Sequence, residues 1–249
     1  MLPSMPMRAL RAALLLLPLA WAAPAAAQVD PEARQRCFDA KADADLKIGA
    51  CTSLIRSGQY DNDGLSRVYT VRGLAYQNSG HAQEAVNDYT QAISLNPSLT
   101  QAVINRATVY ERVGQFGDAL ADYTRATELD GNSADAWMGM CYAHFRLGQT
   151  QASLSDCNRS LRLRPGHFVT LLDRGLIHLR MRNWNLAMAD YDAALGLASD
   201  SSWAHYGRGL ALNGLGRTTQ GRAEIEAAKQ LDAGIGGKHR PFDLNMPLP

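Results

Sequence analysis

The sequence predicts an all-α protein, an α-solenoid of antiparallel helix–turn–helix repeats in five units of 34 residues. Three observations predict this fold. The pattern of residues in the stretch from Arg72 to Pro97 recurs four times along the chain, each time 34 residues further on and without an insertion. Within each unit small and apolar residues recur at helical spacing, as in Ala85, Tyr89 and Ala92. Near the middle of four units lies a glycine, which can end one helix and allow a tight turn.

Residues 1–27 are predicted to form a cleavable secretory signal peptide. Arg8 and Arg11 make a short cationic region, and the apolar run AALLLLPLAWAAPAAA follows. Small residues just before Gln28 fit signal cleavage at that point. The apolar run is shorter than the roughly 20 residues that a membrane-spanning helix needs, and it contains prolines. We therefore expect a periplasmic or secreted protein that does not insert into the membrane after cleavage.

The four cysteines form two pairs that are close in sequence, Cys37 with Cys51 and Cys141 with Cys157. In an oxidising compartment such pairs suggest two local disulfides. A disulfide is the favoured interpretation for Cys37 and Cys51. For Cys141 and Cys157 a disulfide and two buried free thiols are equally favoured. A zinc site is not predicted, because no CxxC motif occurs and no histidine is spaced to complete a ligand set.

Residues 66–235 divide into five consecutive units. The units are 66–99, 100–133, 134–167, 168–201 and 202–235. Each unit has small residues at three fixed positions, a larger apolar residue, usually tyrosine, at a fourth, and a leucine near its end. Small residues let two helices approach closely, and the larger residue fills the space between them. One such pair cannot bury its apolar faces alone, so we expect neighbouring pairs to stack.

Two segments flank the repeats. Residues 28–65 are predicted to cap the first repeat as a degenerate half-repeat, because apolar residues between positions 48 and 55 continue the register of a second helix. A disulfide between Cys37 and Cys51 would hold this segment over the end of the solenoid, which needs covering. Residues 236–249 contain three prolines and are predicted to form a flexible tail.

The period and the pattern G-x-x-Y…A-x-x-x-Y-x-x-A…P, which begins at Gly73, resemble the tetratricopeptide repeat family, here of a secreted or periplasmic bacterial type. Trp137 occupies the large aromatic position at the start of the third unit. The resemblance covers residues 66–235, about two-thirds of the chain. The fifth unit departs most, with Gly221 in place of alanine and Ala233 in place of proline, so its second helix is expected either to fray or to act as a cap.

Charged residues recur with the same period. Arginine precedes the first small position in four units, and an acidic residue precedes the tyrosine position in all five. These residues are Arg72, Arg106, Arg174 and Arg208, with Asp88, Asp122, Asp156, Asp190 and Glu224. We favour ion pairs between helices over a ligand-binding row of charges. The sequence leaves open whether each arginine pairs within its own unit or with a neighbouring one.

The resemblance implies that the first helix of each unit lines a concave groove that binds another protein. The candidate partner-binding residues are Gln77, Asn78, Arg112, Met138, Tyr142, Phe145, Arg146, Leu172, Arg180, Trp203 and Tyr206. The N-terminal half of this set is polar, and the C-terminal half is apolar and aromatic. Aromatic residues and arginine dominate binding hot spots, although the leucines and aromatic residues could instead be interior packing. An apolar or acidic peptide or helix would suit this surface, with its carboxylates at Arg112, Arg146 and Arg180.

Other classes of function find little support. The chain has 25 Lys and Arg against 24 Asp and Glu, so no overall basic charge would attract a nucleic acid. The six histidines show no metal-binding spacing, and no Walker loop, GxSxG or dinucleotide motif occurs. We predict no catalytic residue, metal or cofactor. The favoured function is a protein-binding scaffold; the alternatives are a scaffold in cell-envelope or polysaccharide assembly and an accessory subunit of an envelope hydrolase.

Overall fold

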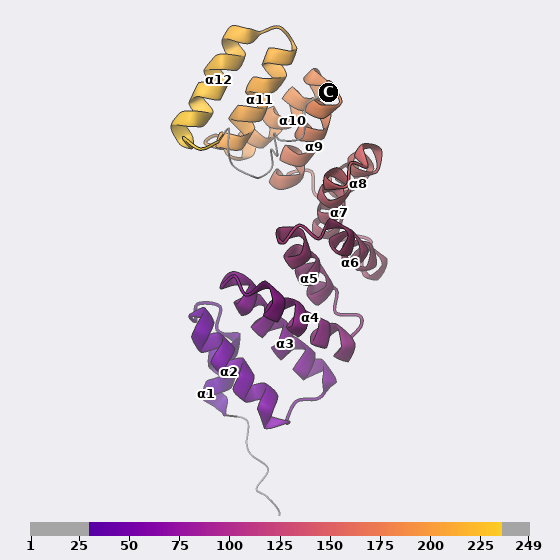
Figure 1. Cartoon of the computed structure of the whole chain (residues 1–249), viewed down its shortest axis with the longest axis vertical. Coiled ribbons are helices and arrows are strands. Elements are labelled where there is room, and N and C mark those ends of the chain that lie inside the picture. The colour runs from indigo at the N-terminus through magenta and orange to yellow at the C-terminus, as the bar shows by residue number, and fades with distance from the viewer. Residues whose placement is uncertain (1–29, 236–249) are drawn as a thin grey trace, which may run out of the picture.

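The computed structural model describes residues 30–235, and every regular element in that range is a helix. The predicted signal peptide and tail lie outside the described residues. The helices are α1 (Pro31–Phe38), α2 (Ala44–Ser57), α3 (Asn62–Asn78), α4 (Ala82–Leu95), α5 (Thr100–Arg112), α6 (Phe116–Leu129), α7 (Ala134–Arg146), α8 (Thr150–Leu163), α9 (Phe168–Arg180), α10 (Trp184–Leu197), α11 (Ser202–Gly214) and α12 (Thr218–Leu231). Successive pairs stack into an elongated array from α1 and α2 at one end to α11 and α12 at the other (Figure 1). The predicted all-α solenoid is confirmed.

The turns inside the repeats follow from backbone conformation. Gly80, Gly114, Gly148 and Gly216 have φ between +77° and +81°, a left-handed conformation that glycine adopts without a steric penalty. In the fourth repeat Arg182 occupies the equivalent position with φ +57°. Each of these residues ends the first helix of its repeat and lets the second helix fold back against it.

The first repeat begins earlier than its 34-residue unit. Helix α3 starts at Asn62, and the side chain of Asp61 accepts a hydrogen bond of 2.7 Å from the backbone nitrogen of Gly64. Aspartate favours this capping position because it satisfies a helix donor that would otherwise lack a partner. The first turn of α3 therefore lies within residues 28–65, the segment predicted as the cap.

The recurring tyrosine packs between three helices. Tyr191 of α10 is fully buried, and its ring lies against Gly175 in its own repeat and Gly207 in the next. A Cβ atom on Gly175 would lie 2.8 Å from the Cζ atom of Tyr191, and one on Gly207 would lie 2.2 Å from it. Tyr123 approaches Gly139 of the next repeat in the same way, at 2.3 Å. Tyrosine rings from neighbouring helices therefore fill the space that a side chain at these glycines would need.

The periodic arginines bind carboxylates within their own repeats. Arg72 donates from Nε and Nη2 to both carboxylate oxygens of Asp88, each at 2.7 Å. Arg106 makes the same two-pronged pair with Asp122 at 2.8 Å, and these hydrogen bonds raise the pKa of Arg106. Such bidentate pairs are among the stronger polar contacts in proteins. The question that the sequence left open is thus answered in favour of pairing within the repeat.

The same arginines also reach the preceding repeat through Nη1. Arg106 donates to Thr90 of α4 at 3.0 Å, and Arg72 donates to Thr52 of α2 at 2.9 Å. The third contact recurs further along the chain. It joins Arg174 to Asn158 at 2.8 Å and Arg208 to Asp192 at 2.9 Å. Each of these arginines therefore connects the two helices of its repeat with the second helix of the repeat before.

The third repeat is held differently. Met140 replaces the arginine, and Cys141 and Cys157 occupy the small position and the tyrosine position. The two cysteines form a disulfide between α7 and α8, and both are fully buried. The second disulfide, between Cys37 and Cys51, joins α1 to α2 at the N-terminal end of the array. A covalent bond thus takes the place of the tyrosine ring in the central repeat, and Asp156 lies beside His144 where the other repeats have an arginine.

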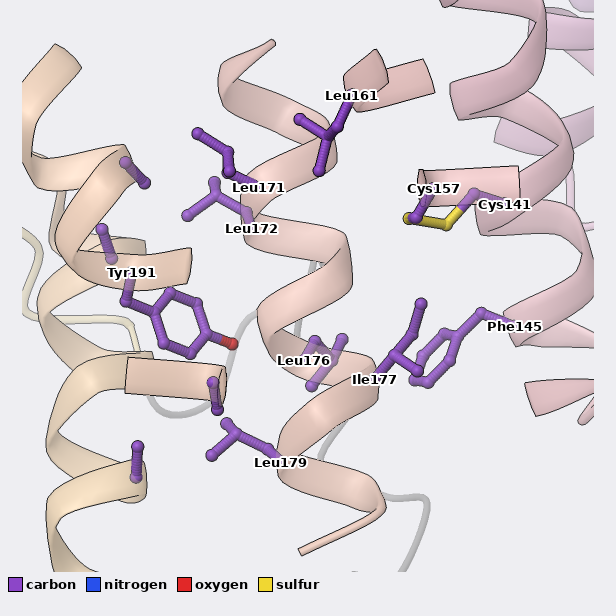
Figure 2. Close-up of a cluster of buried hydrophobic side chains, with 14 residues drawn as sticks. Cys141, Phe145, Cys157, Leu161, Leu171, Leu172, Leu176, Ile177, Leu179 and Tyr191 are labelled. Carbon is purple, nitrogen blue, oxygen red and sulfur yellow. A yellow bond between two sulfur atoms is a disulfide. The ribbon is translucent and has the colours of Figure 1, made fainter. Parts of the chain in front are cut away.

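The largest apolar cluster begins in this central repeat and extends over α7 to α11. In Figure 2, Phe145 of α7 points towards Ile177 of α9, while Tyr191 of α10 points towards Leu172 and Leu176 on the other side of α9. Helix α9 therefore lies between two layers of apolar side chains. At the C-terminal end α12, the second helix of the fifth repeat, is a complete helix that packs against α11 and does not fray; its buried residues are only Gly221 and Ala228.

We predict that G207A destabilises the fold by about 1–3 kcal/mol, because the added methyl group would enter the space of the Tyr191 ring. The matched control is G49A, which places alanine in the middle of α2 where no other group lies within 4 Å. That change is expected to raise the free energy of unfolding by about 0.5–1 kcal/mol through helix propensity. Urea denaturation measures both values, and equal effects of the two substitutions would contradict the packing described for Tyr191.

Candidate functional site

The predicted partner-binding residues lie on α3, α5, α7, α9 and α11, the first helices of the repeats; we call this surface the first-helix face. Eight of them are accessible to differing extents. Asn78 and Arg112 are exposed, whereas Gln77, Met138, Arg146, Arg180, Trp203 and Tyr206 are half-buried. Burial raises the pKa of the Tyr206 hydroxyl. These residues form the part of the predicted set that a partner can reach.

Three members of the predicted set lie inside the protein. Tyr142 is 6% exposed, Phe145 is 6% exposed and Leu172 is 5% exposed. Phe145 and Leu172 belong to the apolar cluster of α7 to α11, because α9 packs directly against α7. Their side chains support the surface from behind and do not project from it, so alanine at Phe145 would alter the core before it altered binding.

Arg146 is held in a fixed position at the C-terminal end of α7. Its guanidinium lies 4.3 Å from the centroid of the Phe116 ring, and its Nη1 donates a hydrogen bond of 2.8 Å to the hydroxyl of Tyr142. The Phe116 and Tyr142 rings meet edge to face at 6.2 Å. Cations are favoured at helix C-termini, and guanidinium planes stack well on aromatic rings. The position of the charge is therefore set before any partner arrives.

Arg112 and Arg180 occupy the equivalent position in the repeats on either side. Arg112 donates from Nη1 to the backbone oxygen of Gln77 at 3.2 Å, and the guanidinium of Arg180 lies 5.4 Å from the centroid of the Phe145 ring. Each contact reaches back to the repeat before. The three arginines form a row along the ends of α5, α7 and α9.

Three hollows meet beside this row, and Val113 lines all of them. Their volumes are about 570, 140 and 520 Å³. The first is lined by Glu111, Arg112, Val113, Gly114, Phe116, Tyr142 and Arg146. The set of partner-binding residues predicted from the sequence did not include Val113 or Phe116. That set was drawn from the first helices, and both residues follow the end of α5. A signal was nevertheless present, since an apolar residue follows the arginine in three successive repeats.

A second polar network connects the third and fourth repeats. Asp135, at the start of α7, accepts hydrogen bonds from Arg164 at 2.9 and 3.1 Å, and its Oδ1 lies 3.1 Å from Nε2 of His167. The Nδ1 atom of His167 lies 2.6 Å from the hydroxyl of Thr170. The hydrogen bonds from Arg164, together with His167, lower the pKa of Asp135. This network connects the start of α7 to the start of α9 through His167.

Two further properties limit the chemistry of residues 30–235. No group of three or more His, Cys, Asp and Glu side chains in that range could hold a metal ion. No helix in the same range is long and apolar enough to cross a membrane. His144 and His178, at equivalent positions in successive repeats, lie instead beside Asp156 at 2.6 Å and Asp190 at 3.9 Å.

Comparison with protein families gives a consistent result. A profile described as tetratricopeptide repeat matches residues 104–168 and 172–234, which together exceed half of the chain. A second profile with the same description matches residues 66–99. The comparison with curated proteins found no match.

Several solved structures share the fold. A tetratricopeptide repeat protein from Parabacteroides merdae has a TM-score of 0.70 at 18% identity, covering 82% of this chain and 80% of that one. MamA has a TM-score of 0.59 at 19% identity, with coverages of 71% and 97%. YrrB, described as a TPR protein with an unusual peptide-binding site, has a TM-score of 0.59 at 15% identity, with coverages of 75% and 94%. At these identities the likeness concerns the fold.

We predict that D135N lowers stability at pH 7 by less than about 1 kcal/mol, since the side chain is half-exposed and its ion pair is screened by water. The folded-state pKa of Asp135 is depressed, so its contribution is present above the unfolded-state pKa. It is lost as the pH falls through the folded-state value. Urea unfolding of wild type and D135N between pH 7 and pH 2.5 should therefore converge at low pH.

The control is D200N, which makes the same charge change at an exposed loop position between α10 and α11. Its effect on stability should be smaller at pH 7. A difference between wild type and D135N that persists unchanged to the lowest pH would contradict the network around Asp135.

Proposed function

Because the chain belongs to the tetratricopeptide repeat family, we propose that it is a protein-binding scaffold whose first-helix face receives a peptide or helix of another protein. The observation that carries this proposal is Arg146, held over Phe116 beside a hollow of about 570 Å³. A charge whose position is already set loses little freedom on binding, which favours affinity. The described peptide-binding site of YrrB supports the same kind of function for this fold.

The accessible residues indicate a partner with both apolar and acidic groups. Trp203 and Tyr206 supply half-buried aromatic rings at the C-terminal end, and Met138 supplies an adaptable side chain near the centre. Arg112, Arg146 and Arg180 supply positive charge. Binding to a surface of this kind needs no covalent chemistry, cofactor or metal, so we propose a scaffold and not an enzyme. A nucleic-acid partner is not proposed, because charges balance over the whole chain.

We further propose that the protein acts in the periplasm or outside the cell. The sequence of residues 1–27 has the pattern of a secretory signal, and all four cysteines are paired as disulfides. Disulfides persist in oxidising compartments and are rare in the cytosol. In that setting the partner could belong to cell-envelope or polysaccharide assembly, or be an envelope hydrolase that uses this chain as an accessory subunit.

We predict that a photo-crosslinking amino acid placed at Arg112, Trp203 or Tyr206 captures a protein partner in the native cell. The controls carry the same amino acid at Gln91 of α4 and Ala193 of α10, which are exposed on second helices. Mass spectrometry of the adducts identifies the partner and therefore separates an envelope hydrolase from an assembly component. Adducts of equal yield at Gln91 and Ala193 would show that the first-helix face is not the binding surface.

We predict that the four cysteines of the exported protein resist thiol labelling until a reductant is added. Mass mapping without reduction should join Cys37 to Cys51 and Cys141 to Cys157. Closing loops of this length stabilises a protein by about 3 kcal/mol, so C141S/C157S should unfold at lower urea concentration. The single variant C37S is the labelling control, because it leaves Cys51 unpaired. Free thiols throughout the exported protein would overturn the proposed compartment.

A further inference from the structure

Repeats two to four end their first helices with the same two-residue pattern, an arginine followed by an apolar residue. The pairs are Arg112-Val113, Arg146-Leu147 and Arg180-Met181. The apolar members are 50%, 42% and 38% exposed, and they recur at one position in three consecutive repeats. The first repeat has Asn78-Ser79 at these positions and the fifth has Gly214-Leu215. The fold therefore does not require the arginine or the exposed apolar residue.

The fourth repeat adds another arginine at a position that favours glycine. Arg182 has φ +57°, whereas the other four repeats place glycine there. A residue with a Cβ atom is disfavoured in the left-handed region, because the Cβ atom comes too close to the following carbonyl oxygen. Residues that keep an unfavourable conformation of this kind occur often at functional sites. Arg182 is not part of the first-helix face, so it provides an observation independent of the predicted groove.

Charge is concentrated on this edge of the solenoid. We define the turn edge as residues 77–83, 111–117, 145–151, 179–185 and 213–219. These segments carry five arginines, including Arg217, and one acidic residue, Glu111, which is 8% exposed. The loops on the opposite edge, which join one repeat to the next, contain Asp130 and Asp200 with Arg164. The balanced charge of the whole chain thus conceals a cationic edge.

The hollows described above open on the turn edge. Val113 lines all three, and Arg112 lines the two that extend towards Gln77 and Phe116. Asp118, in the first turn of α6, lines the far end of the third. An apolar group of a partner that contacts Val113 in the first hollow would lie beside the guanidinium groups of Arg112 and Arg146, which line the same hollow. The turn edge therefore places positive charge beside an apolar hollow around Val113.

We propose that the turn edge of repeats two to four is the track along which an extended, acidic and amphipathic peptide segment of the partner binds. This inference rests on the proposed protein-binding function and specifies the chemistry and path of the bound segment. Its apolar side chains contact Val113, Leu147 and Met181, and its carboxylates meet the neighbouring arginines. A smooth polyanion would use the charges but not the three exposed apolar residues, which is why a peptide is favoured.

The spacing of the repeats suits an extended chain. Packed helices lie about 8–10 Å apart. An extended chain in the polyproline II conformation advances about 3.1 Å per residue with three residues per turn, so every third side chain faces the same side. One repeat then corresponds to roughly three residues of the partner. Acidic residues that recur about every third position could each meet an arginine in successive repeats.

The test is selection of binders from a phage-displayed random 16-residue library on the folded, oxidised mature chain. The most enriched peptide is then synthesised, labelled and titrated by fluorescence anisotropy. We expect enriched peptides to combine acidic and apolar residues, with binding weakened at least fivefold by R182G, by R180Q and by V113D. R182G restores the residue that four other repeats use, so the turn is kept, and its free energy of unfolding is measured alongside. The control R222Q removes an exposed arginine on α12 and should leave affinity unchanged.

The outcomes separate this inference from the proposed function. Peptides without acidic residues, or affinity unaffected by R182G and R180Q, overturn the turn-edge track. If a peptide that is insensitive to R182G and R180Q no longer binds W203A or Y206A, the first-helix face remains the binding site and only the turn-edge proposal fails. If no peptide is enriched, the proposed function fails as well. Heparin or anionic lipid vesicles binding as tightly as the peptide would overturn a peptide partner in favour of a polyanion.

Discussion

Four arginines that each join three helices are the interaction on which this solenoid depends. In the repeat that contains Arg106, one guanidinium binds Asp122 in the second helix and Thr90 in the repeat before. The pair is largely buried, with 16% of the arginine side chain and 9% of the aspartate side chain exposed. A buried charge needs its partner in place, because an unpaired charge in the interior is strongly destabilising. The stacking of repeats is thereby coupled to pairing within them.

The third repeat shows what happens where this arrangement is absent. Met140 cannot bind a carboxylate, and Asp156 is instead 2.6 Å from Nδ1 of His144. Burial raises the pKa of Asp156, so this carboxylate is less well supported than the ones that face arginine. The disulfide between Cys141 and Cys157 adds a covalent connection between α7 and α8. The centre of the array, like its N-terminal end, therefore contains a covalent bond that persists in an oxidising environment.

Features that recur in every repeat could be predicted from the sequence, whereas features that depend on the packing of particular helices could not. The period of 34 residues, the small positions and the arginine–carboxylate pairs could be predicted, since each unit must meet the same neighbours. The burial of Phe145 and Leu172 could not, because it depends on how closely α9 packs against α7. The special positions of Arg182 and Val113 could have been predicted from the repeat alignment. It places Arg182 where the other repeats have glycine, and it aligns Val113 with apolar residues of the next two repeats. The beginning of α3 was likewise signalled by the capping aspartate at position 61.

Position on one helix decides what an arginine does in this protein. Arg106 and Arg112 both lie on α5 and are six residues apart, a rotation of roughly 600° or five-thirds of a turn. The first therefore faces α6 and α4, while the second ends the helix at the turn edge. Arg106 connects helices through its carboxylate partner, and Arg112 adds charge beside the hollow around Val113. Because the inner arginines hold the repeats in register, the outer arginines recur in a fixed row, and a row of this kind can recognise a partner with a matching period.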